Sequence, residues 1–468
     1  MTNPADLTLP EMAARLRDGR LTAETLAQAH LDRIDARDSR VGAFVHVDKQ
    51  AVLATARRAD AELAQGLDRG PLHGICVAIK DIFDVAGWPV RYGSHLYRDR
   101  IAATDSAIVA RLRETGAVPL GLVATYEMAI VGPGNDGLYP QPRNPWNPAH
   151  VTGGSSSGSA AAIAAGMVRV ALGSDTGGSV RSPSAYCGTV GLKPTHDRLP
   201  LDGILPLAPS FDVPGAMGRT VAETALLYCA LCGTPAEAPR LSLDGQRIGY
   251  ARAWSLSPDA HPQIVHTTDA AASTLSLCGA EIRRVTLPPL PLMTAAAAVL
   301  IHAEGFQTHR AHLAGDGGRM GRMPYQSMAA GAVLTESDIA EARRAAGLLR
   351  ACLDALLQEV DALILPTTLT PAPAFAEFAS GQARWTPMCT LPFSMTGHPA
   401  LSVPMGFSDG LPLGLQIVGR FDTEPLLLQI AAAFENATDH GALDATCFTW
   451  RPSPAPRQAP FFMTEETN

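Results

Sequence analysis

The sequence is poor in lysine and lacks both long apolar runs and the marks of an exported protein. Only three of its 37 basic residues are lysines, namely Lys49, Lys80 and Lys193, so each lysine is a candidate for a specific role. The first residues contain no apolar segment typical of a secretory signal. The longest apolar stretch, 292–301, is too short to cross a membrane. We therefore expect a protein of the reducing cytoplasm with no membrane partner.

The charge balance excludes further classes of partner. With 46% hydrophobic residues, 18% charged residues and a net charge of −8, the chain has a globular composition and no basic surplus to attract nucleic acid. Cys229 and Cys232 have a CxxC spacing, but they lie in an apolar run without a second cysteine pair or a nearby histidine. This pattern favours buried cysteines on one helix over a zinc site.

Strand-like and helix-like segments alternate along most of the chain, which indicates an α/β protein with a largely buried sheet. Apolar spacing and small-residue composition predict helices at 9–17, 21–36, 50–64, 105–115, 159–165, 338–360 and 424–435. Short apolar runs predict strands at 74–79, 117–123, 168–172, 362–365, 400–403 and 413–418. We divide the chain into an N-terminal helical segment (1–70), a core (71–234), a variable cap (235–345), a C-terminal part of the core (346–450) and an irregular tail (451–468).

Two clusters of glycine and serine, 153–159 and 173–179, are the most unusual passages. Glycines let a backbone adopt positive φ and approach a ligand closely, and consecutive amides in such turns converge on an anion. Either a phosphate cradle or an oxyanion hole beside a serine nucleophile fits this pattern. The phosphate interpretation is the weaker one, because no Gly-Lys-Ser/Thr follows the glycines.

A nucleophile elbow is a second rival, since residues 154–158 satisfy Gly-x-Ser-x-Gly with Ser156 at its centre. An elbow needs a strand directly before it. Here the preceding residues, 144–148, read Asn-Pro-Trp-Asn-Pro and cannot form a central strand. We interpret this match as accidental.

The two clusters and their flanks resemble the signature of the amidase signature family. The resemblance rests on GGSSSGSAAAIAAG, ALGSDTGGSVRSPSAYCGTVGLKPT, GPLHGICVAIKDIFDVAG, NPWNP, TGHPALSVPMG and LPLGLQIVGR. It covers nearly the whole chain and is weakest over 235–345. It implies one large α/β/α domain with a mixed central sheet flanked by helices, and no metal or organic cofactor.

The resemblance also implies site residues. Ser179 matches the serine that the family acylates, Ser155 the serine held in a cis peptide, and Lys80 the base. The backbone amides of the turn that ends at Ser179 are the expected oxyanion hole: Thr176, Gly177, Gly178 and Ser179. The chain departs from the commonest family pattern at Cys76, Ser157 and 196–198, none of which removes a catalytic group.

Elementary chemistry makes sense of this trio. A serine hydroxyl is a weak nucleophile unless a base removes its proton, and burial can lower the pKa of Lys80 enough for that task. Ser155 would relay the proton. We expect Asp175 and Arg181 to brace the loop, and His398 to have a turn or packing role.

The expected activity is hydrolysis of a small amide, or of an ester or carbamate, through an acyl-enzyme on Ser179. The alternatives are the A subunit of a tRNA-dependent amidotransferase, which works on glutamine with partner subunits, and an inactive binding protein. Because pockets tend to be apolar and aromatic, candidate pocket residues are Tyr126, Trp146, Tyr325 and Met328. The sequence leaves the oligomeric state open, and the resemblance is compatible with a homodimer.

Overall fold

One mixed sheet runs through the described part of the molecule. The computed structural model describes residues 3–134, 136–237, 239–379 and 386–441, and the expected tail, 451–468, lies outside them. Within these residues the sheet has eleven strands in the order β1-β3-β2-β4-β6-β5-β10-β11-β9-β7-β8. The strands are β1 (Phe44–His46), β2 (Cys76–Lys80), β3 (Val118–Val123), β4 (Val170–Asp175), β5 (Val190–Lys193), β6 (Val213–Gly218), β7 (Arg247–Tyr250), β8 (Glu281–Arg284), β9 (Ala362–Pro366), β10 (Ala400–Ser408) and β11 (Leu411–Val418).

Parallel pairing places the ends of the early strands together. β2 pairs in parallel with β3 on one side and β4 on the other, and every residue of these three strands is buried. Strands buried on both faces are continuous apolar runs, as here. Since the carboxyl ends of parallel strands share one edge, Lys80 at the end of β2 and Asp175 at the end of β4 lie at the same edge.

The second half of the sheet is mostly antiparallel. β6 pairs with β4 and β5, and β10 pairs with β5 and β11. β9 pairs antiparallel with β11, and β7 pairs in parallel with both β9 and β8. The expected mixed sheet is therefore confirmed. Its strands β1, β5, β6, β7 and β8 were not among those predicted.

Helices surround the sheet, and seven of those described correspond to the predicted ones, namely α1, α2, α3, α4, α5, α12 and α15. They are α1 (Leu9–Arg17), α2 (Ala23–Val41), α3 (Lys49–Ala64), α4 (Ala107–Glu114), α5 (Ser157–Ala164), α6 (Arg181–Cys187), α7 (Val221–Cys232), α8 (Arg252–Ser255), α9 (Pro262–Leu277), α10 (Leu290–Gly315), α11 (Arg322–Ala329), α12 (Glu336–Glu359), α13 (Phe375–Ala379), α14 (Leu391–Met395) and α15 (Glu424–Asn436). The described helices include none long and apolar enough to span a bilayer.

Two glycines of β6 show that helices cover both faces. A Cβ at Gly215 would meet Val180, next to α6, whereas a Cβ at Gly218 would meet Thr224 of α7. Positions 215 and 218 face opposite sides of a strand. The helices α6 and α7 therefore pack on opposite faces of the sheet, as an α/β/α arrangement requires.

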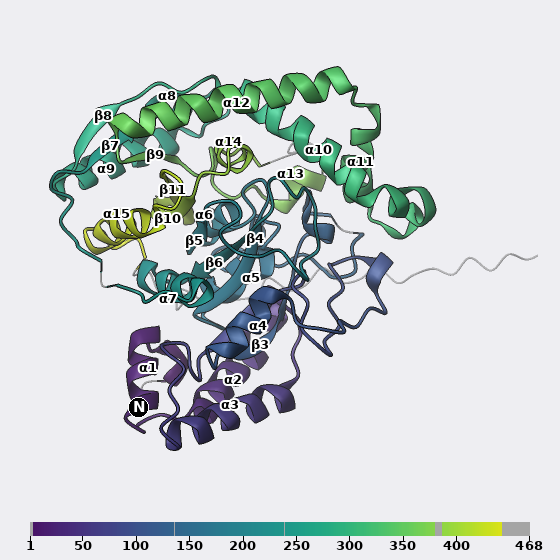
Figure 1. Cartoon of the computed structure of the whole chain (residues 1–468), viewed down its shortest axis with the longest axis vertical. Helices are drawn as coiled ribbons and strands as arrows, with labels where there is room; N and C mark the ends of the chain where they lie inside the picture. Colours follow the sequence, from purple (N-terminus) through teal and green to yellow (C-terminus); the bar gives the residue numbers. More distant parts are fainter. Residues whose placement is uncertain (1–2, 135, 238, 380–385, 442–468) are drawn as a thin grey trace, which may run out of the picture.

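The segment 235–345, expected to form a variable cap, is more regular than its sequence pattern suggested. It contributes β7 and β8 to the sheet and the 26-residue helix α10. In Figure 1 the helices α10, α11 and α12 lie at the end of the molecule opposite α1, α2 and α3. Apolar residues lie on all sides of α10, so its sequence lacks the one-sided apolar spacing that predicts a helix, although its buried residues recur every three or four positions.

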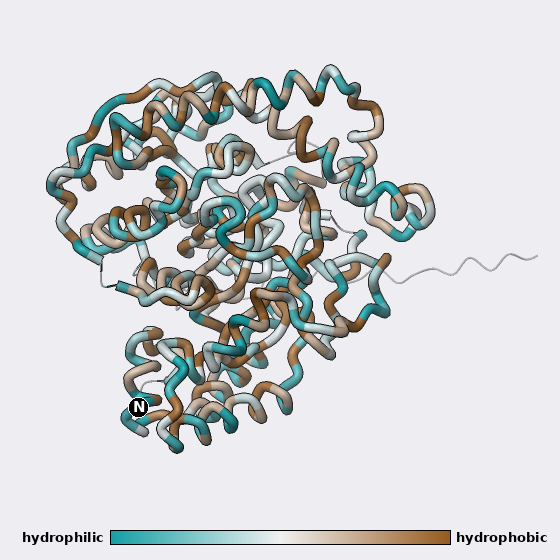
Figure 2. The backbone as a smooth tube through the Cα atoms, viewed as in Figure 1, coloured by the Kyte–Doolittle hydropathy of each residue, from teal (hydrophilic) through white to brown (hydrophobic). Residues whose placement is uncertain are grey.

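Helix α12 offers a sharp test of how burial stabilises this fold. It alternates between hydrophilic and hydrophobic stretches (Figure 2). Leu349 is fully buried, whereas its neighbour Leu348 is 73% exposed. Leu349→Ala should lower the free energy of unfolding by about 2–5 kcal/mol, because it leaves a cavity, whereas Leu348→Ala should change it by less than about 0.5 kcal/mol. Thermal unfolding midpoints of the two variants measure the contrast, and equal midpoints would contradict the packing of α12.

Candidate active site

Lys80 lies at the carboxyl end of β2 and is fully buried. Its Nζ donates to the hydroxyls of Ser155 and Ser174, each at 2.8 Å. Burial lowers the pKa of the Lys80 ammonium to about 7, while the charges of Asp175 and Asp212 oppose this shift. A substantial fraction of the lysine is therefore neutral near pH 7, which is the form able to accept a proton.

The first glycine and serine cluster brings Ser155 to this lysine. Ser155 precedes α5 and is 1% exposed, and the Gly154–Ser155 peptide bond is cis, as the resemblance implied. The carbonyl of Ser155 accepts from the amide of Tyr126 at 3.1 Å. A Cβ at Gly154 would collide with the Tyr126 ring, so only glycine fits at this position.

Ser156 joins the two clusters and does not act as an elbow serine. It is fully buried, its hydroxyl donates to the Ser174 carbonyl at 3.2 Å, and it accepts from the Ser174 amide at 3.2 Å. The Ser156 amide donates to the carbonyl of Ser179 at 3.2 Å. The backbone on either side of Ser155 is thus tied to the turn that carries Ser179.

An ion pair between Asp175 and Arg181 shapes that turn, and both side chains are fully buried. Arg181 donates to the carboxylate from Nε at 2.9 Å and from a terminal nitrogen at 2.7 Å. The same carboxylate accepts the amides of Gly178 at 2.8 Å and Val180 at 3.1 Å. Burial alone would raise the pKa of Asp175, but the charge and hydrogen bonds of Arg181 hold it at about 2. The expected bracing role fits these contacts.

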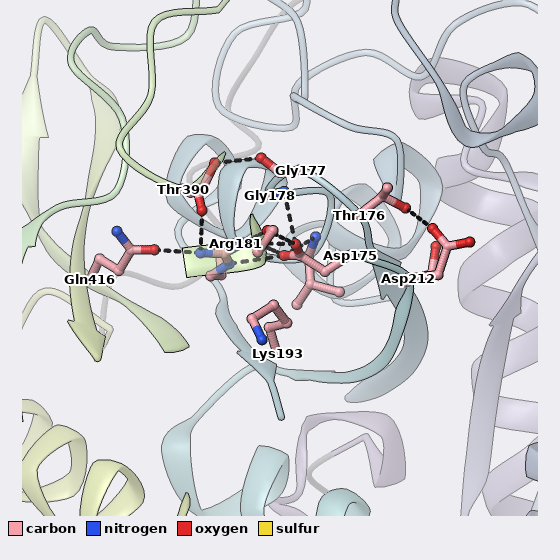
Figure 3. Close-up of polar contacts among 12 residues, drawn as sticks. Asp175, Thr176, Gly177, Gly178, Arg181, Lys193, Asp212, Thr390 and Gln416 are labelled. Carbon is pink, nitrogen blue, oxygen red and sulfur yellow. Dashed lines mark hydrogen bonds and ion pairs between the residues drawn. The ribbon is translucent and has the colours of Figure 1, made fainter. Parts of the chain in front are cut away.

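Residues from the C-terminal half complete the support, as Figure 3 shows. Arg181 also donates to Gln416 Oε1 at 2.7 Å and to the Thr390 carbonyl at 3.1 Å. The hydroxyl of Thr390 donates to the Gly177 carbonyl at 2.7 Å. Gly178 has φ +126°, and a Cβ there would collide with the Thr390 side chain. No other residue type fits this turn.

The four amides expected to form an oxyanion hole are not equally free. The Gly178 amide is already committed to Asp175. Among the described residues, the amides of Thr176, Gly177 and Ser179 have no protein acceptor. Thr176 lies at the start of the turn, and its hydroxyl donates to Asp212 Oδ1 at 2.5 Å. The geometry therefore leaves the amides of Thr176, Gly177 and Ser179 as candidate donors.

A cavity of about 400 Å³ opens onto this turn. Its wall includes Thr176, Gly177, Gly178 and Ser179 of this turn, together with Tyr126. Apolar side chains make up much of the remainder, namely Ile130, Val131, Leu207, Ile301, Met388 and Leu391. The described residues of this wall include no aspartate, glutamate, lysine or arginine.

Only one of the four expected pocket residues, Tyr126, lines the cavity. Trp146 lies elsewhere, where its ring packs edge-on against Phe407 and its Nε1 donates to the Cys187 carbonyl at 2.8 Å. Met328 is fully buried in the main core, and Tyr325 is 38% exposed. Aromatic or apolar character alone does not distinguish a pocket wall from packing elsewhere.

Sequence reasoning missed Ser174 and Asp212. The hydroxyl of Ser174 is the second group on Lys80 Nζ, and Asp212 accepts the amides of Leu207 at 2.8 Å and Ala208 at 3.1 Å. Burial raises the pKa of Asp212 to about 6, despite the lowering effect of the Thr176 hydroxyl. Ser174 lies within the second glycine and serine cluster, next to Asp175, and this position could have marked it as a site residue. No sequence pattern marks Asp212.

Other polar candidates have structural partners. His398 is buried, with Thr396 Oγ1 at 3.0 Å from Nδ1 and Asp354 at 3.2 Å from Nε2. Burial raises the pKa of the Cys187 thiol, whose Sγ donates to a backbone carbonyl. Within the described residues, no group of three or more His, Cys, Asp or Glu side chains is placed to hold a metal.

The chain is similar in sequence and in fold to known proteins. The Amidase family model matches residues 25–428. The chain is 33% identical to the A subunit of the glutamyl-tRNA(Gln) amidotransferase of Salinispora arenicola, over 93% of this chain and 98% of that protein. A peptide amidase from Stenotrophomonas maltophilia has a similar structure, with 31% identity, a TM-score of 0.78 and coverage of 93% of this chain and 97% of that one. Another amidase crystal structure is 30% identical, with a TM-score of 0.83 over 92% of this chain and 99% of that one.

The family match spans most of the sequence, and the relatives' folds match over more than nine-tenths of this chain. The two glycine and serine clusters, which carried the resemblance, surround one buried lysine. This chain therefore belongs to the amidase signature family.

Proposed function

We propose that this protein hydrolyses the C–N bond of a small amide through an acyl-enzyme on Ser179. The observation that carries the proposal is Lys80, a buried lysine with a pKa of about 7 held between two serine hydroxyls, beside a turn that opens onto a cavity. A buried base linked to hydroxyls is suited to proton transfer, and a strongly shifted pKa beside a cavity is typical of a catalytic group.

The acylation step uses groups from both clusters. Ser179 Oγ attacks the amide carbon while its proton passes to Ser155 Oγ, and the Ser155 proton passes to neutral Lys80. The C–O bond forms and the carbonyl oxygen takes up the negative charge. When the C–N bond breaks, the proton returns from Lys80 through Ser155 to the leaving nitrogen. A water molecule then attacks the ester by the same route, which releases the acid and restores Ser179.

The turn supplies the electrostatic part of catalysis. The amides of Thr176, Gly177 and Ser179 are the proposed donors to the oxyanion, because the Gly178 amide is held by Asp175. Losing one such donor typically lowers the rate by about 10²–10³-fold. Asp175 and Arg181 act through the turn: they position the amides and do not touch the substrate.

A glutamine-dependent amidotransferase component is the second candidate, favoured by the identity with the Salinispora arenicola protein. Glutamine would bring both an ammonium and a carboxylate group into the site. Burying charges without partners is costly, and the described part of the cavity wall contains no aspartate, glutamate, lysine or arginine. This composition supports an uncharged amide as the substrate.

The nucleophile assignment is tested by purified variants on a panel of aliphatic and aryl amides, esters and carbamates. Ser179→Ala, Ser155→Ala and Lys80→Ala should each lower kcat/KM by at least about 10³-fold, because the three act as one unit. Ser159→Ala is the matched control: this serine of the same cluster donates to the Leu172 carbonyl, away from Lys80, and its loss should change kcat/KM little.

Activity that survives in Ser179→Ala would overturn the proposed nucleophile. If wild type hydrolyses nothing alone but becomes a glutaminase with a co-purified second protein, the amidotransferase function replaces the proposal. Labelling of wild type by a fluorophosphonate, compared with Ser179→Ala, reports the reactive serine independently of substrate choice.

The dependence of activity on pH follows from Lys80. Its neutral form accepts the proton, so kcat/KM should rise with pH through about 7 and level off above it, falling about tenfold per pH unit on the acid side. Asp212 raises the pKa of Lys80, so Asp212→Asn should move the inflection to lower pH. Profiles of kcat/KM against pH on a neutral amide, for wild type and Asp212→Asn, measure the inflection and its shift. An inflection that disappears in Asp212→Asn would assign it to the carboxyl group instead.

A further inference from the structure

A hydrogen-bonded pair of neutral side chains, His302 and Ser327, lies in the wall of the otherwise mostly apolar cavity. His302 comes from α10, which also presents Thr294, Ala298 and Ile301 to the cavity; this spacing places all four on one helix face. Ser327 comes from α11, and its hydroxyl lies 3.1 Å from His302 Nε2. Neither residue belongs to the two clusters that provide the proposed chemistry.

The pair has unused hydrogen-bonding capacity. Burial lowers the pKa of the His302 imidazole, so the ring is neutral near pH 7. One ring nitrogen meets Ser327, and the other has no hydrogen-bond partner within the described part of the chain. Whichever tautomer is present, the neutral ring and the hydroxyl together offer a ligand at least one donor or acceptor. Such a group on an apolar wall discriminates between ligands, because leaving it unpaired against an apolar ligand costs free energy.

The position of α11 is fixed by contacts on the other side of the cavity. Glu127, next to the cavity residue Tyr126, accepts from the amide of Gly321 at 3.0 Å. Asp136 accepts from the amide of Arg322 at 2.6 Å. Two carboxylates thus satisfy amides at the N-terminus of α11, a favourable place for negative charge. The helix that carries Ser327 is therefore anchored to the segment that carries Tyr126.

We propose that His302 and Ser327 determine specificity, selecting amides whose acyl group is uncharged, mainly apolar, and carries one hydrogen-bonding atom such as a hydroxyl or ether oxygen. This inference rests on the proposed amide hydrolysis and names the substrate class for that same site. The apolar wall accommodates the carbon chain, and the pair recognises the single polar atom.

The test uses straight-chain primary amides of several lengths. At each length the set contains one plain amide, one with a terminal hydroxyl, one with a terminal ammonium and one with a terminal carboxylate. Primary amides place the variable group on the acyl side, because the leaving ammonia fills no pocket. For the chain length that is turned over best, wild type should prefer the hydroxyl amide to the plain one by about fivefold in kcat/KM, the usual effect of one neutral hydrogen bond. The charged amides should be the poorest substrates.

Variants separate recognition from folding. His302→Leu and Ser327→Ala should each bring the ratio of kcat/KM for the hydroxyl amide to kcat/KM for the plain amide close to one, and His302→Gln should restore part of the preference. His312→Leu is the matched control, since His312 lies on the same helix and pairs with Tyr97 at 3.0 Å but does not line the cavity. It should keep the preference of wild type.

Binding of the same amides to the Ser179→Ala variant, measured by ligand-detected NMR titration, compares their affinities without turnover. If wild type hydrolyses no amide, the proposed function fails, yet a hydroxyl preference that His302→Leu removes would still support recognition by the pair. A preference that survives in both His302→Leu and Ser327→Ala, or tightest binding of a charged amide, would overturn the inference.

Discussion

The buried ion pair between Asp175 and Arg181 is the interaction on which the site depends. It joins the end of β4 to the first residue of α6, and Arg181 extends it to Gln416 on β11 and to the Thr390 carbonyl. Removing one partner from such a pair typically costs about 3–5 kcal/mol, because the other charge is left buried and unpaired. The carboxylate also holds the Gly178 amide, so the charge that joins the two halves of the chain also shapes the turn beside Ser179.

Burial alone does not make a lysine a base. Lys80 and Lys193 are both fully buried, and burial lowers the pKa of each to about 7. Lys193 donates to the carbonyl of Pro194, an acceptor that cannot pass a proton on. Lys80 instead meets the hydroxyls of Ser155 and Ser174, which can both accept and donate. The chemistry of a buried amine therefore depends on whether its partners can carry a proton to a place that substrate reaches.

The sequence predicts structure correctly where local pattern determines it. Periodic apolar spacing placed α1 and α12, and the two glycine and serine clusters pointed to the neighbourhood of Lys80. Short strands such as β5 and β6 escaped, since their glycines and prolines obscure the pattern and only pairing with distant strands makes them regular. Of the residues proposed for the pocket wall, only Tyr126 was predicted correctly. Trp146 and Met328 have the right chemistry, yet tertiary packing places them elsewhere.

The groups around Lys80 could be predicted and most of the cavity wall could not, for one physical reason. Proton transfer needs polar groups within hydrogen-bonding distance, and the Lys80, Ser155 and Ser174 contacts come from strand ends and tight turns whose glycines are visible in the sequence. A cavity needs only side chains that leave space. Here α10 and α11 provide the part of the wall that contains His302 and Ser327. Both helices belong to the segment whose sequence patterns resemble the family least. The hydrogen bonds that shape the turn beside Ser179 join β4, α6 and β11 rather than these two helices. The cavity face of α10 and α11 can therefore change without disturbing the hydrogen bonds between Lys80 and the two clusters, so that the proposed substrate selection can vary while the proposed chemistry at Lys80 is kept.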